Sequence, residues 1–437
     1  MNMKQRLLSL LLLVSMLLTC APAAVAAGED APDFAGSVTL NMLSETVKQE
    51  VTVKTFIDGD TTHFHVPASF SPDGVLKARY LAINTPESTG KIEEYGKKAA
   101  AFTREKLSAA TSIIVESDTA SWNLDSTGDR HLVWVWYKTD DMTEYRNLNI
   151  EILQNGLAIA NSTANNRYGS VATAALNYAK EQKLHVHSHQ PDPDFYYGDA
   201  IELTLKELRS NLETYNGIKV AFNGVVTMND NNSVYVEAFD PETGMYFGMP
   251  VYYGFGLSGM GLAILNVGNE VRIVGTLQYY EAGGTWQVSG LEYRMMYPND
   301  PGNIQKISSG NAPAWVPTTP ETFLYGTVAI AAEEETITLP YQEAALATSV
   351  EMHDLKVVFI YTTDQADSSS NGAMTLTCKH GEDTVIVRTA VLRDKSGKLI
   401  TEEAYMGKTI SVKGIVDFFD GGYQIKVFMP DHITIHD

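Results

Sequence analysis

Acidic, amide and cationic side chains come together in this sequence at the ends of two neighbouring predicted strands. Asp60 and Asn84 offer side-chain oxygens and Thr85 a backbone carbonyl, which are the ligands that a hard cation such as calcium prefers. Arg79 lies five residues before Asn84, and its planar guanidinium matches two oxygens of a phosphate. Glu87 follows at the mouth of the same site. These residue types indicate a site that holds a metal ion beside a phosphate.

The stretch that carries these residues, together with four later motifs, resembles the staphylococcal nuclease (thermonuclease) family. The first long helix of that family, its arginine-bearing turn, the close of its second helix and the tail of its third helix have counterparts at residues 94–103, 125–130, 155–158 and 181–184. The motifs follow the order of the family, and the resemblance covers residues 48–188. It implies an OB-type five-stranded barrel with three helices, which is an α+β first domain in a mainly β chain.

The resemblance implies that this domain hydrolyses phosphodiester bonds of DNA or RNA by metal-assisted in-line attack of water. Glu87 then positions or deprotonates the attacking water, and Arg79 and Arg130 clamp the phosphate. The implied cofactor is Ca²⁺, held by Asp60, Asn84 and Thr85. Taken singly, the motifs have plainer explanations as a hairpin turn, a helix start and a solvated turn residue. Their occurrence together and in order favours a nuclease site.

Three departures from the family pattern bear on metal and substrate binding. Asn84 stands where the family has a second metal-binding aspartate, which removes one negative charge and weakens the expected metal binding. Asp129 is inserted directly before Arg130, so that this arginine reaches the site from a longer turn beside a carboxylate. The Lys-Tyr pair of the family is absent at residues 126–127, and its aromatic residues are absent at residues 159–162. We therefore expect altered contacts with the nucleotide.

The N-terminus has the layout of a bacterial secretory signal at residues 1–27. Lys4 and Arg6 precede an apolar run over residues 7–18, and small residues follow at the predicted cleavage site. We predict a secreted, extracellular protein without a transmembrane segment in the mature chain, with lipoprotein anchoring through Cys20 as the alternative. Cleavage leaves Cys378 as the single cysteine, so we expect no internal disulfide.

The net charge of −21 is concentrated in the second half of the chain. Residues 28–190 hold 15 Lys+Arg and 21 Asp+Glu, which gives −6, whereas residues 191–437 hold 15 and 32, which gives −17. The two Lys+Arg of the signal complete the sum, because 2 − 6 − 17 is −21. Since nucleic-acid binding relies on Lys and Arg that neutralise phosphates, this balance argues against a polyanion as the main partner of the later region.

The region after residue 190 contains an internal repeat. Residues 218–222, 268–275 and 283–287 match residues 355–359, 407–414 and 421–424 in the same order. Each copy has alternating apolar residues and glycine turns, which predicts a small β-barrel. We therefore divide the chain into a nuclease-like domain at 48–188, an OB-like β domain at 199–298, a linker at 299–320 and a second OB-like β domain at 321–437. A histidine-containing exit segment, with metal binding by its histidines as the alternative, lies at 185–194.

The function expected from these patterns is that of a secreted calcium-dependent endonuclease whose substrate is DNA, RNA or both. The alternative is a catalytically weak nuclease-fold binding protein of the cell envelope. The acidic C-terminal modules are expected to contact a protein, a glycan or the cell envelope, or to give structural support; the alternative is that they contact single-stranded nucleic acid through aromatic platforms. The candidate platform residues are Tyr279, Tyr280, Trp286, Phe418, Phe419 and Tyr423.

Overall fold

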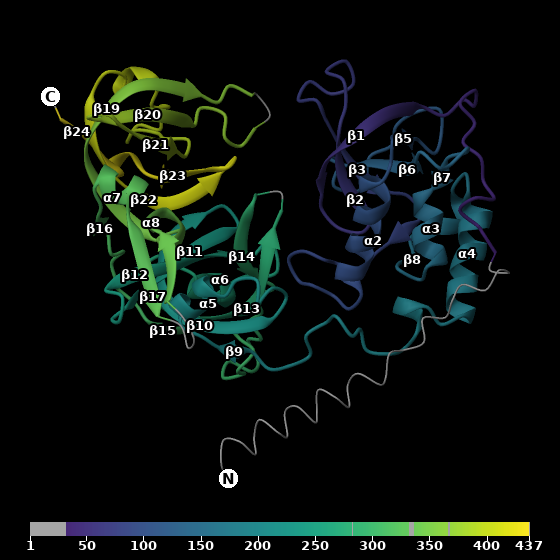
Figure 1. Cartoon of the computed structure of the whole chain (residues 1–437), viewed down its shortest axis with the longest axis horizontal. Coiled ribbons are helices and arrows are strands. Elements are labelled where there is room, and N and C mark those ends of the chain that lie inside the picture. The colour runs from purple at the N-terminus through teal and green to yellow at the C-terminus, as the bar shows by residue number, and fades with distance from the viewer. Residues whose placement is uncertain (1–31, 282, 332–335, 366–367, 437) are drawn as a thin grey trace, which may run out of the picture.

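The computed structural model describes residues 32–436 except 282, 332–335 and 366–367. The predicted signal at 1–27, including Cys20, lies outside the described residues. Figure 1 shows the first barrel with its helices in one lobe and two further barrels side by side in the other. The predicted fold class is confirmed, because the chain is mainly β and contains three five-stranded barrels of mixed strand direction. No helix among the described residues is long and apolar enough to cross a membrane.

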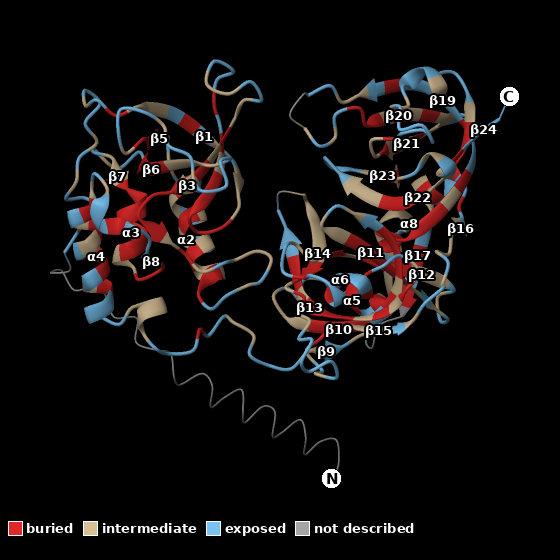
Figure 2. Ribbon diagram, turned by 180° about the vertical axis from the view of Figure 1, so that it is seen from behind, coloured by how far each residue is buried: buried red, intermediate tan, exposed pale blue. Residues whose placement is uncertain are grey.

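The three barrels share one strand order. In each, the sheet runs first, second, third, fifth and fourth, and the fourth strand closes on the first. The third and fifth strands pair in parallel, whereas the other pairs within the barrel are antiparallel. Figure 2 shows that the buried residues gather inside each barrel, as expected for strands whose side chains alternate between core and solvent.

The first barrel is covered by helices. Its strands are β1 (Lys48–Phe56), β2 (Thr61–His65), β3 (Val75–Tyr80), β5 (Ser112–Glu116) and β6 (His131–Lys138), with β7 (Arg146–Asn147) at the edge. The three expected helices are α2 (Gly96–Ser108), α3 (Leu148–Gln154) and α4 (Gly169–Glu181). Helix α3 begins where the Asn147 side chain accepts a hydrogen bond from the Ile150 backbone N–H, at 3.1 Å. Short strands β4 (Ile83–Asn84) and β8 (Ile159–Ala160) pair beside the barrel.

The second and third barrels are the two copies of the sequence repeat. The strands of the second are β10 (Lys219–Asp230), β11 (Ser233–Asp240), β12 (Met245–Tyr252), β13 (Glu270–Tyr280) and β14 (Thr285–Ser289). Those of the third are β19 (Ser349–Thr362), β20 (Met374–His380), β21 (Asp383–Thr389), β22 (Thr409–Phe419) and β23 (Gly422–Val427). The glycines Gly275 and Gly414, which match in the repeat, are required for the same structural reason. A Cβ there would lie 2.6 Å from the Ser289 carbonyl oxygen and 2.7 Å from that of Lys426, because neighbouring strands approach closely.

Further elements extend or cover these two barrels. They are β9 (Ile201–Glu202), α5 (Leu205–Ser210), α6 (Met260–Ile264), β15 (Gln305–Ser308), β16 (Val316–Pro317), α7 (Pro320–Tyr325), β17 (Thr327–Ala331), β18 (Thr336–Pro340), α8 (Tyr341–Ala344) and β24 (Ile433–His436). The segment predicted as a linker thus contributes β15 to the sheet of the second barrel and β16 to that of the third. Val328 and Ile330 of β17 pack into the core of the second barrel. The exact domain boundaries stay a prediction.

The second and third barrels are joined by buried contacts. The carboxylate of Glu237 accepts hydrogen bonds from the backbone N–H of Ser349 at 2.7 Å, from the Ser349 hydroxyl at 2.8 Å and from the backbone N–H of Ala314 at 2.8 Å. Asp230 and Lys426 form an ion pair at 2.5 Å across the same boundary. These contacts, together with a small apolar cluster from both barrels, hold the two barrels in one arrangement.

Candidate functional site

The tight turn between β1 and β2, which packs against α2, buries Asp60. Its side chain is buried, and its Oδ2 accepts a hydrogen bond from the Thr85 backbone N–H at 2.8 Å. The turn can pack this closely only with a glycine at position 59, since a Cβ there would lie 2.8 Å from the Cβ of Ala99 in α2. The Thr103 hydroxyl donates to the Gly59 carbonyl at 2.6 Å and ties the turn to the same helix.

Arg79 joins the two side chains that were predicted as metal ligands. Its guanidinium forms an ion pair with Asp60 and donates a hydrogen bond to the Asn84 side-chain oxygen. The hydroxyl of Thr85, which lies beside Asp60, is buried without a hydrogen-bond partner among the described residues. The structure thus brings together Asp60, Arg79, Asn84 and Thr85 at the end of β3 and β4, as the sequence spacing predicted. Their roles stay predictions.

Asp58 is a nearby acidic residue that the sequence analysis did not include. It is buried, and its Oδ1 accepts the backbone N–H of Asp60 at 3.0 Å. Burial raises the pKa of Asp58, although the nearby guanidinium of Arg79 opposes the shift. The signal that could have revealed it is the Asp-Gly-Asp spacing, which puts two carboxylates on one short turn.

Glu87 lies at the open side of this cluster. Its backbone N–H donates to a side-chain oxygen of Glu93 at 3.1 Å, and its carbonyl accepts from the Glu93 N–H at 2.9 Å. Its side chain reaches solvent on one side, but partial burial raises its pKa, and the carboxylates of Asp58 and Glu93 raise it further. The positive charges of Arg79 and Arg130 oppose this rise in the pKa of Glu87.

Arg130 is oriented by an acid other than the one expected. The inserted Asp129 pairs with Lys77 at 2.7 Å, whereas Arg130 is held by Asp125 at 2.6 Å. Burial by itself would raise the pKa of Asp125, but hydrogen bonds from Thr127 and Arg130 outweigh it and lower the pKa to about 2. Asp125 therefore stays ionised at neutral pH and holds the guanidinium at the edge of the site.

The loop that follows Glu87 rests on the second barrel. The carbonyl of Gly90 accepts hydrogen bonds from the Gln278 side-chain amide at 2.6 Å and from the Ser289 hydroxyl at 2.8 Å. Lys91 pairs with Glu292 at 2.7 Å beside them. The second barrel thus holds the loop on which the predicted base lies.

The exit segment of the first domain forms one wall of a groove next to the site. A groove of about 830 Å³ runs from Asn84 past Ile159 to the ring pair Phe195 and Tyr197, whose centroids lie 4.9 Å apart. Asp192 fixes this segment by accepting the backbone N–H of Tyr95 at 2.6 Å. These two rings are aromatic groups that the family resemblance did not predict.

The histidines of the exit segment do not form a metal centre. The Nδ1 of His185 lies 2.7 Å from the carbonyl oxygen of Asn155, and the Nε2 of His187 lies 3.2 Å from that of Ala158. Within the described part of the chain, no group of three or more His, Cys, Asp or Glu side chains is placed to hold a metal ion. That statement concerns His, Cys, Asp and Glu only, so it does not count the side-chain oxygen of Asn84 or the oxygens of Thr85.

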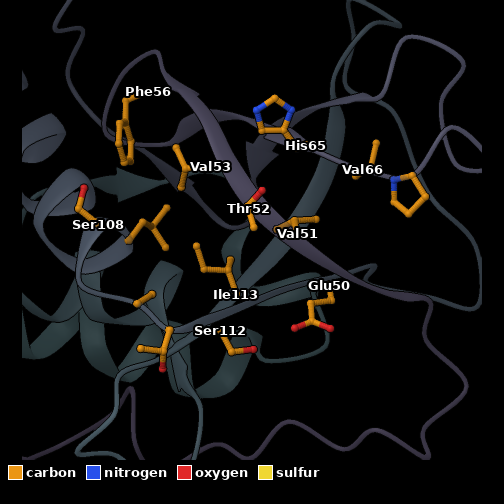
Figure 3. A pocket seen from close by; sticks show the side chains of 14 residues that line it. Glu50, Val51, Thr52, Val53, Phe56, His65, Val66, Ser108, Ser112 and Ile113 are labelled. Atoms are coloured by element: carbon orange, nitrogen blue, oxygen red, sulfur yellow. The ribbon is translucent and has the colours of Figure 1, made fainter.

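A separate pocket lies away from these residues. Its lining residues come mainly from β1, β5 and the end of α2, and Figure 3 shows Val53 and Ile113 near the middle of this lining. It measures about 640 Å³ and contains none of the predicted site residues.

Part of the first domain matches a known protein family. Residues 77–188 match the model of a family described as Staphylococcal nuclease homologue. The match includes Arg79, Asn84, Thr85, Glu87 and Arg130 and begins after Asp60. A search of curated proteins gave no match. The first barrel thus contains a domain of the staphylococcal nuclease family. Membership of this family indicates a hydrolase of nucleic acids, and the family typically uses Ca²⁺.

Proposed function

We propose that the first barrel is a calcium-dependent endonuclease that cleaves DNA or RNA outside the cell. The observation that carries the proposal is that the domain matched to the nuclease family contains Arg79, Glu87 and Arg130, whose charges act on one another. Export by the predicted signal at 1–27 supports the extracellular location. The later barrels are accessory modules in this proposal.

The side chains can divide the work of phosphodiester hydrolysis. Glu87, at the open side, accepts a proton from the attacking water when it is ionised. Arg79 and Arg130 each offer a planar set of N–H donors to the non-bridging phosphate oxygens, where negative charge develops in the transition state. Asp125 keeps Arg130 in place before substrate binds, which reduces the ordering that catalysis requires.

The donor set fits a hard divalent cation. Asp60, Asn84 and Thr85 supply oxygens, the Thr85 hydroxyl has no partner among the described residues, and the buried Asp58 carboxylate adds a negative charge that a cation would offset. A bound calcium ion would neutralise charge on the phosphate and polarise it. Arg79 bridges Asp60 and Asn84 in this structure, so occupancy by a cation requires its guanidinium to turn toward the phosphate.

The test is cleavage of single-stranded DNA, duplex DNA and RNA by the purified protein with added calcium and with chelator. We expect metal-dependent cleavage of at least one substrate. Absence of cleavage at high calcium, in protein that is folded by circular dichroism, would contradict the proposal.

A second candidate function is nucleic-acid or protein binding without turnover. The bridge from Arg79 to Asp60 and Asn84 favours it, because that bridge occupies the oxygens a metal needs. This candidate predicts retention of a labelled oligonucleotide by the protein with no cleavage at any calcium concentration.

Replacing the neutral metal ligand by an acid should strengthen calcium binding. We expect Asn84→Asp to lower the dissociation constant for calcium, since it restores a negative charge among the oxygen ligands. Calcium titration by calorimetry measures the change, with Asn155→Asp outside the site as the matched control. Unchanged or weaker binding would show that the new carboxylate pairs with Arg79 instead.

The pH dependence of cleavage should report the environment of Glu87. The base must be ionised, and its pKa is raised, so the acidic limb of the kcat/KM profile should lie above the ordinary glutamate value of 4.5. Glu93→Gln removes one of the neighbouring carboxylates that raise this pKa and should move the limb to lower pH. A limb at or below pH 4.5 in the unmodified protein would contradict the assignment.

The contact between the Glu87 loop and the second barrel should affect turnover more than binding. In Gln278→Ala combined with Ser289→Ala, the Gly90 carbonyl loses both donors, and we expect kcat to fall by up to about 10²-fold with little change in KM. The melting temperature should stay close to that of the unmodified protein. The pair Gln424→Ala and Ser411→Ala on the third barrel is the control. An equal loss in kcat for both pairs would contradict a positioning role.

A further inference from the structure

A large cleft lies between the second and third barrels, away from the nuclease-like site. It measures about 1440 Å³ and is lined by β20, β21 and β23 of the third barrel on one side and by the end of β10 on the other. Figure 1 shows these strands facing the second barrel within the same lobe. The Asp230–Lys426 ion pair and the buried contacts of Glu237 fix the two walls, so the cleft is formed before any ligand binds.

Four aromatic rings line this cleft, and two of them are exposed. Tyr361 and Phe419 are 53% and 67% exposed, and Trp315 and Phe428 are half-buried. Single exposed aromatic rings are normal on a protein surface, but several that line one cleft indicate a binding site. The face of an aromatic ring carries partial negative charge and attracts the weakly positive C–H groups of a ligand.

Polar side chains with fixed orientation lie among the rings. The Gln424 amide donates to Asp417 at 2.8 Å, next to the Lys426 that pairs with Asp230. The guanidinium of Arg388 donates to the Thr375 hydroxyl at 2.9 Å and the Thr363 hydroxyl at 3.0 Å. These hydrogen bonds use only some of the donors and acceptors of these side chains. The remaining donors and acceptors can bind a ligand rich in hydroxyls.

The charge and size of the cleft restrict the ligand class. Asp230, Asp417 and Asp420 offset the cations Arg388 and Lys426, so the lining does not favour a chain of phosphates. The volume exceeds the roughly 300–1,000 Å³ of pockets for single small molecules, which suits a short polymer. In an OB-type barrel, the face of the second and third strands is where oligonucleotides and oligosaccharides bind, and β20 and β21 are those strands here.

We propose that this cleft binds a neutral oligosaccharide. Sugar rings present C–H groups on their faces to Tyr361 and Phe419, and hydroxyls at their edges to Asp417, Gln424 and Arg388. The acidic charge of the C-terminal region, which disfavours nucleic acid, is compatible with an uncharged glycan. The third barrel would then hold the protein on a glycan surface while the first barrel acts independently.

The test is calorimetric titration of the full chain with chitotetraose, cellohexaose and maltohexaose, and separately with a twelve-residue oligo(dT) strand. We expect saturable binding of at least one glycan, and about tenfold or greater weakening, which is ~1.4 kcal/mol or more, in Phe419→Ala and in Arg388→Ala. Phe239→Ala and Arg393→Ala are matched controls outside the cleft and should bind normally. Nucleic-acid cleavage by the first barrel should be unchanged in all four variants.

Three results would overturn the proposal. The first is absence of glycan binding to folded protein. The second is glycan binding that persists unchanged in Phe419→Ala and Arg388→Ala. The third is preferential binding of the oligo(dT) strand that is lost in the same two variants, which would make the cleft a nucleic-acid site. Because cleavage is measured separately, failure of the nuclease proposal leaves this test intact.

Discussion

Glu87→Gln is expected to reduce the rate of nucleic-acid cleavage by about 10²–10⁴-fold, the usual contribution of a positioned general base. Glutamine has nearly the same shape as glutamate but cannot accept a proton from water at neutral pH. The backbone contacts of residue 87 with Glu93 do not involve the altered side chain, so the loop should keep its conformation. Initial rates on the best substrate, measured at saturating calcium, give the comparison.

The control for this variant is Glu105→Gln on the exposed surface of α2, which removes the same charge far from the cluster. Its rate should match that of the unmodified protein. If Glu87→Gln cleaves within a few-fold of the control, the base is another group, and the buried Asp58 would be the first residue to examine.

Arg79→Lys is expected to lower kcat by about 10²–10³-fold, equivalent to ~2.7–4 kcal/mol of transition-state stabilisation. Lysine keeps the positive charge that the buried Asp60 needs, so the variant should fold. It loses the planar fork, which in this structure reaches Asp60 and Asn84 at once and which would grip two phosphate oxygens. Rates and melting temperatures are both measured.

The matched control is Arg146→Lys, whose guanidinium pairs with Asp33 at 2.7 Å outside the site. It should cleave normally. Equal activity of the two lysine variants would show that the residue at position 79 acts as a structural counter-charge to Asp60 and takes no part in phosphate binding.

Local patterns were sufficient to predict most of the first domain. The motifs around Asp60, Asn84 and Glu87 lie within one turn and two strands, where spacing along the chain fixes spacing in space. The residues that resemble the helices of the family, 94–103, 155–158 and 181–184, overlap or directly follow α2, α3 and α4. The repeat also predicted the later barrels. Its glycines Gly275 and Gly414 lie where a neighbouring strand approaches too closely for a Cβ in both barrels, so the same sequence pattern marks the same local structure.

The contacts between distant segments were not predictable in this way. The pairing of Arg130 with Asp125 and not with the adjacent Asp129 depends on the shape of one turn. The hydrogen bond from Gln278 to Gly90 joins residues 188 positions apart, and the Asp230–Lys426 pair joins residues 196 positions apart. No local pattern encodes such distances, because they depend on how whole barrels pack.

The sequence by itself thus determined the family of the first domain, the presence of two further barrels and the residues that could bind metal and phosphate. Short-range spacing and backbone preference carry that information. Only the tertiary structure decided that Arg79 bridges Asp60 and Asn84, that Asp58 lies beside them, and that an aromatic cleft opens between the last two barrels. These features arise from side chains brought together by packing, and packing is a property of the folded chain as a whole.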